Sequence, residues 1–136
     1  MIEGVAFHHH GLALQDDRDA LVVLASLGYQ AGPLIHDPVQ DVRLRLCTSG
    51  RMPAVEIVMP GDAPGPLSGI LKRQDQLLYH TCYEVESRES VLAAWDAADL
   101  RMVEVLPPTP AILFGGRKVS FHTVMGFGLV ELLDRV

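Results

Sequence analysis

VAFHHHGLAL, residues 5–14, and LLYHTCYEV, residues 77–85, both alternate in the manner of a β-strand. In the first stretch His9 and Gly11 share a face, and in the second His80 and Cys82 share a face. A helical pattern and then several strand patterns follow each stretch, so the order strand, helix, several strands occurs twice. Such a recurrence indicates a duplicated structural unit with a period of about half the chain.

The first half continues with a helix that Asp16 or Asp17 caps and that Gly28 ends. Its apolar residues at helical spacing are Leu21, Leu24 and Leu27. Three strands are predicted next, around residues 29–35 (YQAGPLI), 42–47 (VRLRLC) and 53–59 (PAVEIVM). In the last of these strands, alternation places Ala54, Glu56 and Val58 on one face.

The second half follows a connection rich in Pro and Gly, PGDAPGPLSG at residues 60–69, which runs into a short helix. Ser87 is expected to cap a later helix with Val91, Trp95 and Ala98 on its inner face. Strands are predicted at residues 102–106, 111–114, 118–124 and 128–133. We therefore expect one domain over residues 1–136, with module one at about 1–60, a linker helix at about 61–75 and module two at about 76–136.

Each half supplies one histidine early and one glutamate late. His80 lies 71 positions after His9 (80 minus 9), and Glu131 lies 75 positions after Glu56 (131 minus 56). A lone His in an apolar strand is more often a hydrogen-bonded core residue, and a lone Glu is usually exposed on the solvent face. Four such residues at matching places in two repeats instead predict convergence about a pseudo-twofold axis.

Two imidazoles and two carboxylates suit a borderline divalent ion such as Zn, Ni, Co, Mn or Fe(II). Glu131 lies in the apolar run GLVELL, and Glu56 lies in AVEIV. A buried carboxylate usually finds a partner or becomes protonated, and a metal ion is one such partner. We therefore predict His9, Glu56, His80 and Glu131 as metal ligands. His8, His10 and His122 lack this support, and Cys82 is expected to be a buried, inert thiol.

The motifs HHHGLAL (8–14), AVEIVMP (54–60), GPLSGILKR (65–73), LYHTCYEV (78–85), GGRKVSF (115–121) and GLVELL (128–133) resemble the vicinal oxygen chelate superfamily. The resemblance is to glyoxalase I and methylmalonyl-CoA epimerases and covers almost the whole chain. It implies an α+β fold in which tandem βαβββ modules form a curled mixed sheet around a metal site. It also implies the ligand set His9, Glu56, His80 and Glu131, and a homodimer.

The resemblance further implies an isomerase or lyase that moves a proton next to a carbonyl of a small-molecule substrate, an acyl-CoA or a 2-oxo compound. In the superfamily the metal binds two neighbouring substrate oxygens and polarises a carbonyl. Glu131 is the first choice for the catalytic base and Glu56 the second. One position departs from the pattern, because Leu44 in DVRLRL stands where related epimerases carry a second catalytic Glu.

Two other functions remain open. An Fe(II)-dependent dioxygenase of the same fold would use two His and one Glu, and a fourth protein ligand would occupy a position that such chemistry needs. A non-catalytic small-molecule binding protein of the same fold would not need the ligand set that this chain retains.

Composition limits the partners. The formal net charge of −6 argues against general affinity for nucleic acid or anionic membranes. Local basic residues are weak candidates for holding an anionic substrate: Arg43, Arg45, Lys72, Arg73, Arg117 and Lys118. The chain shows no span of ~18 apolar residues and no secretory leader pattern. With only Cys47 and Cys82 as cysteines, a cytoplasmic protein with reduced thiols is expected.

Overall fold

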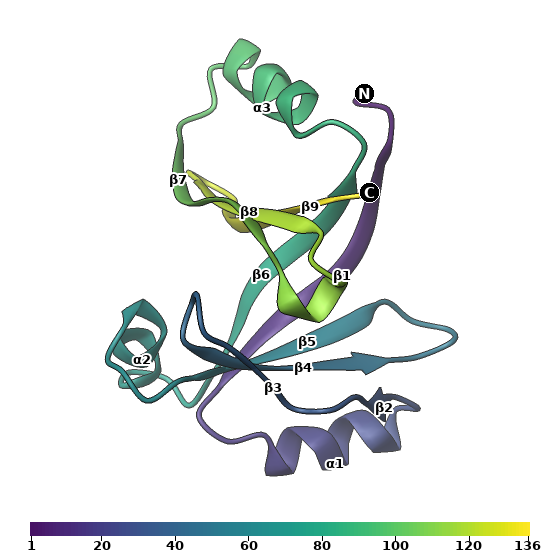
Figure 1. Cartoon of the computed structure of the whole chain (residues 1–136), viewed down its shortest axis with the longest axis vertical. Helices are drawn as coiled ribbons and strands as arrows, with labels where there is room; N and C mark the ends of the chain where they lie inside the picture. The colour runs from purple at the N-terminus through teal and green to yellow at the C-terminus, as the bar shows by residue number, and fades with distance from the viewer. The chain divides into compact units, whose positions relative to one another are not determined.

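The computed structural model describes residues 1–136 and contains nine β-strands and three α-helices (Figure 1). In chain order the elements are β1 (Val5–Leu14), α1 (Arg18–Ser26), β2 (Gln30–Ala31), β3 (Ile35–Asp37), β4 (Val42–Thr48), β5 (Ala54–Pro60), α2 (Pro66–Leu71), β6 (Gln76–Val85), α3 (Arg88–Ala97), β7 (Met102–Pro110), the 3-10 turn η1 (Ile112–Phe114), β8 (Lys118–Val124) and β9 (Gly128–Asp134). The α+β class predicted from the sequence is confirmed, since parallel and antiparallel strand pairs combine with helices.

The chain divides into two compact units. The first unit is His9–Tyr79, and the second unit is Met1–His8 together with His80–Val136. Each contains one repeat of the strand and helix order predicted from the sequence. The module boundaries expected near residues 60 and 76 stay predictions. None of the helices is both long enough and apolar enough to cross a bilayer.

The first unit orders its strands β2, β4, β5, β1, and β3 also pairs with β4. β1 and β5 are parallel, whereas β4 and β5 are antiparallel. One face of these strands packs against α1 through a cluster of buried side chains: Leu14, Leu24, Cys47, Ile57 and Met59. Burial of this apolar face holds the unit together and leaves the other face for His9 and Glu56.

Helix α1 begins after Asp16 and Asp17, the two residues predicted as its possible caps. Asp17 is its N-cap residue, but the Asp17 side chain accepts no capping hydrogen bond, and Asp16 Oδ1 accepts one from the Arg18 backbone N–H at 2.8 Å. Leu24 is buried as expected, whereas Leu27 follows the last helical residue and is 58% exposed. Gly28 has a φ of +95°, which confirms the left-handed residue predicted at the helix end.

The single strand expected over residues 29–35 is two short strands, β2 and β3. The break falls at Gly32 and Pro33. The Gly32 backbone N–H still donates to Leu46 O at 2.8 Å, but Pro33 has no N–H to continue the ladder. The expectation was therefore wrong about continuity, although both pieces pair with β4.

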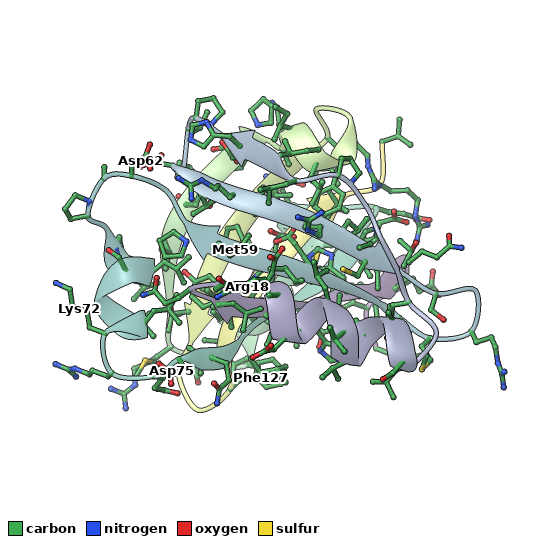
Figure 2. All side chains as sticks on the ribbon, turned by 90° about the horizontal axis from the view of Figure 1, so that it is seen from below. Arg18, Met59, Asp62, Lys72, Asp75 and Phe127 are labelled. Carbon is green, nitrogen blue, oxygen red and sulfur yellow. The ribbon has the colours of Figure 1, made fainter.

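The short connecting helix is confirmed as α2 (Pro66–Leu71). Pro66 is at the first helical position, where its missing N–H has no helical partner to lose. Leu67 and Leu71 are buried, whereas Lys72, which is labelled in Figure 2, is exposed just after the helix. This apolar stripe packs the connection onto the first unit, to which α2 belongs.

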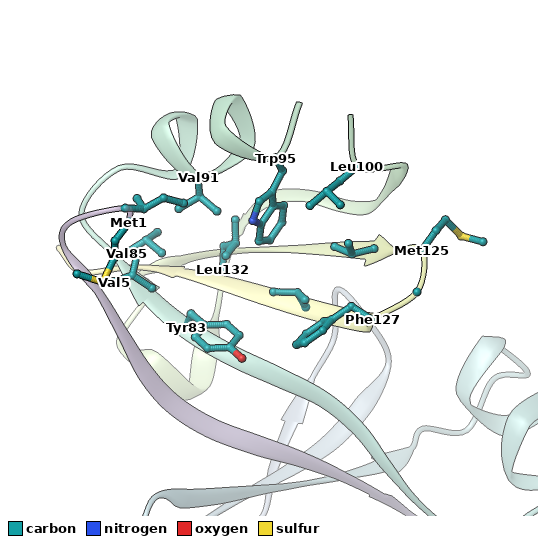
Figure 3. A pocket seen from close by; sticks show the side chains of 14 residues that line it. Met1, Val5, Tyr83, Val85, Val91, Trp95, Leu100, Met125, Phe127 and Leu132 are labelled. Carbon is teal, nitrogen blue, oxygen red and sulfur yellow. The ribbon is translucent and has the colours of Figure 1, made fainter. Parts of the chain in front are cut away.

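The second unit orders its strands β6, β9, β8, β7. Ser87 caps α3 by accepting the Ser90 backbone N–H at 3.1 Å, as predicted. Val91 is buried and Trp95 half-buried above the sheet, as Figure 3 shows, but Ala98 lies beyond the helix and is exposed. Val91 of α3 joins a cluster with buried side chains of the sheet: Val85, Val124, Val130 and Leu132.

Residues 111–114 do not form the predicted strand. Ile112–Phe114 is a 3-10 turn, and Gly115 and Gly116 follow with φ of +64° and +81°. Two successive left-handed residues reverse the chain at low steric cost only because both are glycine. The reversal lets Ala111 and Arg117 pair through their backbones before β8 begins. Apolar composition alone did not distinguish this turn from a strand.

Candidate functional site

The first unit places His9 and Glu56 beside each other. β1 and β5 run parallel with Gly11 opposite Glu56, and His9 stands two residues before Gly11, on the same face. His9 Nε2 lies 3.7 Å from Glu56 Oε2, and the two side chains are 0% and 5% exposed. This pair therefore combines an imidazole nitrogen and a carboxylate oxygen away from solvent.

The second unit contains the corresponding pair, His80 and Glu131. β6 and β9 run parallel with Cys82 opposite Glu131, and His80 stands two residues before Cys82. Both side chains of the pair are buried, and their possible ligand atoms lie within 4.8 Å of each other. Phe121 packs edge-on against His80 at a ring-centroid distance of 5.2 Å, which restricts the orientation of the imidazole.

The two pairs have the same strand register. In each unit one residue lies opposite the glutamate on the parallel strand, and the histidine stands two residues before that residue. The sequence predicted one His early and one Glu late in each half, and the structure brings these residues together within each unit. That all four share one metal ion stays a prediction.

Glu131 has the electrostatic character of a group able to exchange a proton near neutrality. Burial raises the pKa of Glu131 to about 7, and a hydrogen bond with the Cys82 side chain opposes this rise. Near pH 7 both protonation states of the carboxyl group are then accessible. Sequence reasoning treated Cys82 only as an inert thiol, because the register that places it opposite Glu131 depends on strand pairing.

The donor atoms of the pairs fit a divalent metal ion. Two donors at ~2.1 Å from a tetrahedrally coordinated ion are about 3.4 Å apart. The separation of 3.7 Å between His9 Nε2 and Glu56 Oε2 is close to that value. Nitrogen and carboxylate oxygen together favour a borderline ion over calcium. His9, Glu56, His80 and Glu131 are therefore suitable ligands by chemistry and by burial.

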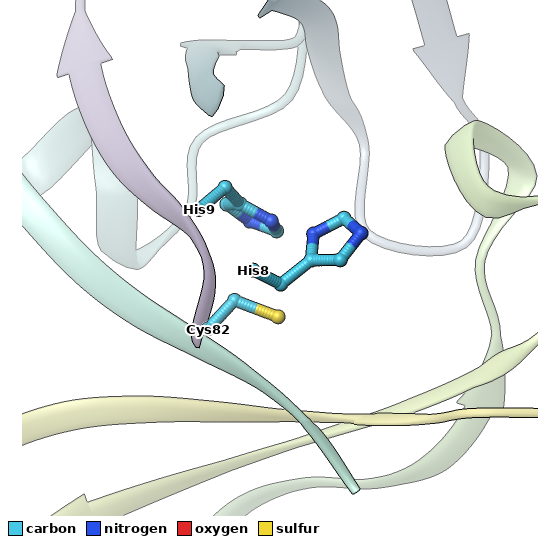
Figure 4. Close-up of side chains that lie close together, drawn as sticks. All are labelled: His8, His9 and Cys82. Atoms are coloured by element: carbon cyan, nitrogen blue, oxygen red, sulfur yellow. The ribbon is translucent and has the colours of Figure 1, made fainter. Parts of the chain in front are cut away.

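The neighbouring histidines have other surroundings. Figure 4 shows His8 and His9 on β1 and Cys82 on β6. His8 contacts the Phe114 ring edge-on at a centroid distance of 5.3 Å, and burial lowers the pKa of His8. Cys82 is a buried thiol that forms no disulfide, within the cluster that contains Phe121.

His122 has a structural partner in Ser120. Ser120 Oγ and His122 Nε2 lie 2.9 Å apart, and both residues are buried on β8. Burial lowers the pKa of His122, with Glu104 opposing and Arg88 adding to the shift. Phe121, between them, is the residue paired with Glu131, so alternation directs Ser120 and His122 to the opposite face of the sheet.

Several basic residues considered for anion binding are already paired with carboxylates. Asp62, labelled in Figure 2, accepts from Arg43 at 2.7 Å. Arg45 donates to Asp17 at 2.9 Å, and Arg117 donates to Glu84 at 2.7 Å. The remaining candidates are exposed: Lys72, Arg73 and Lys118.

Leu44 occupies a position where a second base would face the same side as Glu56. It lies on β4 opposite Val58 of β5, two residues along that strand from Glu56. Leu44 is 7% exposed, so a side chain at this position has little contact with water. An unpaired carboxylate there would be costly to bury.

The sequence-family model of the Glyoxalase/Bleomycin resistance protein/Dioxygenase superfamily matches residues 8–121 of the chain. The chain belongs to this superfamily. The resemblance to vicinal oxygen chelate proteins inferred from the sequence is thus confirmed. No curated protein sequence matches the chain.

Solved structures of the superfamily fold are similar over nearly the full length. A hypothetical protein from Bacillus halodurans is 19% identical, with 97% of this chain and 95% of that chain covered and a TM-score of 0.78. Methylmalonyl-CoA epimerase from Mycobacterium tuberculosis is 16% identical, with 99% of this chain and 89% of that chain covered and a TM-score of 0.77. A Streptomyces coelicolor methylmalonyl-CoA epimerase variant in complex with 2-nitronate-propionyl-CoA is 15% identical, with 97% of this chain and 98% of that chain covered and a TM-score of 0.73. At these identities the likeness shows the fold.

Proposed function

We propose that this superfamily member is a divalent-metal-dependent isomerase or lyase that moves a proton next to a substrate carbonyl. The observation that carries the proposal is the buried His and Glu pair found at the same strand register in both units. Keeping four ionisable side chains buried is costly unless they have partners. A shared functional requirement on both halves accounts for this repetition.

The proposed metal centre combines both pairs, with His9 and Glu56 from the first unit and His80 and Glu131 from the second. A divalent ion bound by protein usually takes three or four protein ligands, and one pair supplies only two. Zn, Ni, Co, Mn and Fe(II) all suit two imidazoles and two carboxylates. Such an ion would supply Lewis acidity toward a carbonyl oxygen of the substrate.

Glu131 is the proposed catalytic base. Its carboxylate accepts a proton from the carbon next to the carbonyl and returns it, to the same or a neighbouring atom. In the metal-free protein burial raises the pKa of Glu131 to about 7, so the carboxyl group there is neither permanently charged nor permanently protonated. Glu56 is the second choice for this role.

The proposed substrate is a small molecule with a carbonyl group, an acyl-CoA or a 2-oxo compound. Superfamily membership and the likeness to methylmalonyl-CoA epimerases support this class. Leu44 counts against a two-base epimerisation, since an apolar residue stands where a second base is expected. Substituting Leu44→Glu should then confer or accelerate racemisation of a 2-methyl thioester.

A homodimer located in the cytoplasm completes the proposal. The superfamily resemblance supports the dimer, and the two buried cysteines, which form no disulfide, are compatible with a reducing compartment. Light scattering at micromolar protein concentration should give twice the chain mass of 14.9 kDa. A monomer mass would contradict the dimer and leave the chemistry unaffected.

Solvent exchange tests the function directly. The protein loaded with each candidate metal is incubated with acyl-CoA and 2-oxo compounds in deuterium oxide, and mass spectrometry follows deuterium at the carbon next to the carbonyl. We expect exchange with at least one compound class, even without net product, and its loss after chelation of the metal. Metal-loaded protein that exchanges none of these compounds but consumes oxygen with catechols would show dioxygenase chemistry instead.

A further inference from the structure

The second unit contains a cavity of about 620 Å³ between α3, the strands β6 and β9, and the N-terminal segment (Figure 3). Its floor consists of side chains that are at most 1% exposed: Val85, Val130 and Leu132. Tyr83 of β6 and Trp95 of α3 supply aromatic walls. Phe127, at the rim, is 67% exposed.

A space of this size is unusual between a helix and the sheet that it covers. Protein interiors are packed at a density of roughly 0.75, with few voids larger than a water molecule. Small-molecule sites, by contrast, commonly occupy about 300–1,000 Å³ and are lined mainly by apolar and aromatic side chains. The size and the apolar, aromatic lining of this cavity agree with those of a small-molecule site.

The lining also defines the chemistry of the occupant. None of the lining side chains carries a charge, and the Tyr83 hydroxyl and the Trp95 indole N–H are the side-chain groups able to donate a hydrogen bond. An acyl-CoA or any phosphate would lose its hydration here, and no cationic side chain lines the cavity to compensate. Charge complementarity therefore favours an uncharged, largely apolar molecule.

The depth of the cavity favours a small molecule over a second protein chain. A flat protein surface would contact the exposed rim, at Leu100, Met125 and Phe127, but not the buried floor. A molecule that enters the cavity would contact the half-buried rings of Tyr83 and Trp95.

We propose that the cavity beneath α3 is a binding site for a small, uncharged, apolar molecule with an aromatic or branched aliphatic body. It is separate from the proposed metal centre. Val130 and Leu132 flank Glu131 in β9, and alternation directs them to the opposite face of that strand. The inference therefore does not depend on the proposed function.

Trp95 makes the site directly observable, because it is the only tryptophan of the chain. The uncharged fluorophore N-phenyl-1-naphthylamine is titrated into the full-length protein while Trp95 emission is recorded. We expect saturable quenching of Trp95 with a stoichiometry of about one probe per chain. Quenching that rises linearly without saturation would overturn the proposal.

A pair of matched surface variants tests the location. Phe127→Glu places a charge at the rim, and Val22→Glu places one at a similarly exposed position of α1 in the first unit. Since both positions are exposed, neither change should impair folding. Phe127→Glu should weaken probe binding by about tenfold or more, whereas Val22→Glu should leave it unchanged. Equal affinity in the two variants would overturn the proposal.

The test also detects the competing occupant. A second copy of the chain seated on the groove would keep the wild-type protein from binding the probe. Light scattering would then show a dimer that Phe127→Glu converts to a monomer. That combination of results would assign the groove to chain association and contradict a small-molecule site.

Discussion

The two units agree on the face that carries histidine and glutamate, and they differ on the face toward the helix. In both units a glutamate lies across a parallel strand pair from the position two residues after a histidine. Behind these strands, α1 packs Leu24 into a cluster with Ile57, whereas α3 borders a cavity of about 620 Å³. A repeat that is preserved on one face and altered on the other supports the proposal that the preserved face carries the chemistry.

The equivalent glutamates also have different neighbours. Gly11, opposite Glu56, has no side chain, whereas Cys82, opposite Glu131, forms a hydrogen bond with the carboxyl group. Two glutamates proposed to hold the same ion need not be equivalent in proton transfer. The comparison therefore predicts equal contributions to metal binding and unequal contributions to catalysis.

The largest predicted difference between the halves is in proton exchange. Glu131→Gln keeps the size and one oxygen donor but removes the base, so exchange should fall by a factor of about a hundred or more. Glu56→Gln should reduce exchange by less than about tenfold, with similar metal content in both variants. Deuterium incorporation measured at matched metal loading checks this. A larger loss in Glu56→Gln would assign the base to the first unit.

The raised pKa of Glu131 predicts a pH dependence of stability in metal-free protein. Between the ordinary glutamate pKa of 4.5 and about 7, the unfolded chain loses the proton that the folded chain retains. The free energy of unfolding should therefore fall as pH rises through this interval, by on the order of 3 kcal/mol at most. Urea unfolding with a chelator present should show this slope in the wild type and a weaker slope in Glu131→Gln. Parallel profiles would show that Glu131 has an ordinary pKa.

Enlarging a buried helix residue tests the difference in packing. Leu24→Phe in α1 should destabilise the protein by about 1–3 kcal/mol, because its cluster leaves no room for a larger ring. Val91→Phe in α3 adds more volume but faces the cavity, so we expect a cost below about 1 kcal/mol. Thermal unfolding of both variants measures the difference. A greater loss in Val91→Phe would mean that the second unit is as tightly packed as the first.

The smallest predicted effect concerns the ion pairs that join each helix start to its sheet. Asp17 of the first unit pairs with Arg45, and Arg88 of the second unit pairs with Asp134. The Arg88 side chain is 7% exposed and the Arg45 side chain 20%, so losing the partner should cost more at Arg88. Asp134→Asn should destabilise by about 2 kcal/mol and Asp17→Asn by about 1 kcal/mol. Chemical denaturation of the two variants gives the order.

Alternation and repetition in the sequence predicted the repeated strand and helix order and the His and Glu of each half, whereas the fold class was implied by the superfamily resemblance. They act through local geometry, since a strand that alternates places His9 and Gly11 on one face whatever surrounds it. The pairing of Gly11 with Glu56 adds information that only the folded sheet contains.

Other features depend on contacts that the sequence does not reveal. The turn at Ile112–Phe114 is apolar enough for a strand, and the left-handed Gly115 and Gly116 decide its shape. The role of Cys82 follows from the register of β6 against β9. The cavity beneath α3 depends on how closely the side chains of α3 pack against the sheet, and the spacing of apolar residues in the sequence does not predict this.

Metal stoichiometry tests the central claim most directly. Metal-free protein is titrated with zinc by calorimetry, for the wild type, His9→Ala, His80→Ala and the control His36→Ala, whose imidazole is exposed on β3. We predict about one ion per chain, an affinity reduced by roughly a hundredfold or more in both His9→Ala and His80→Ala, and no change in His36→Ala. Two ions per chain, with each of the two variants losing only one of them, would show that the units bind metal separately and would contradict a shared four-ligand centre.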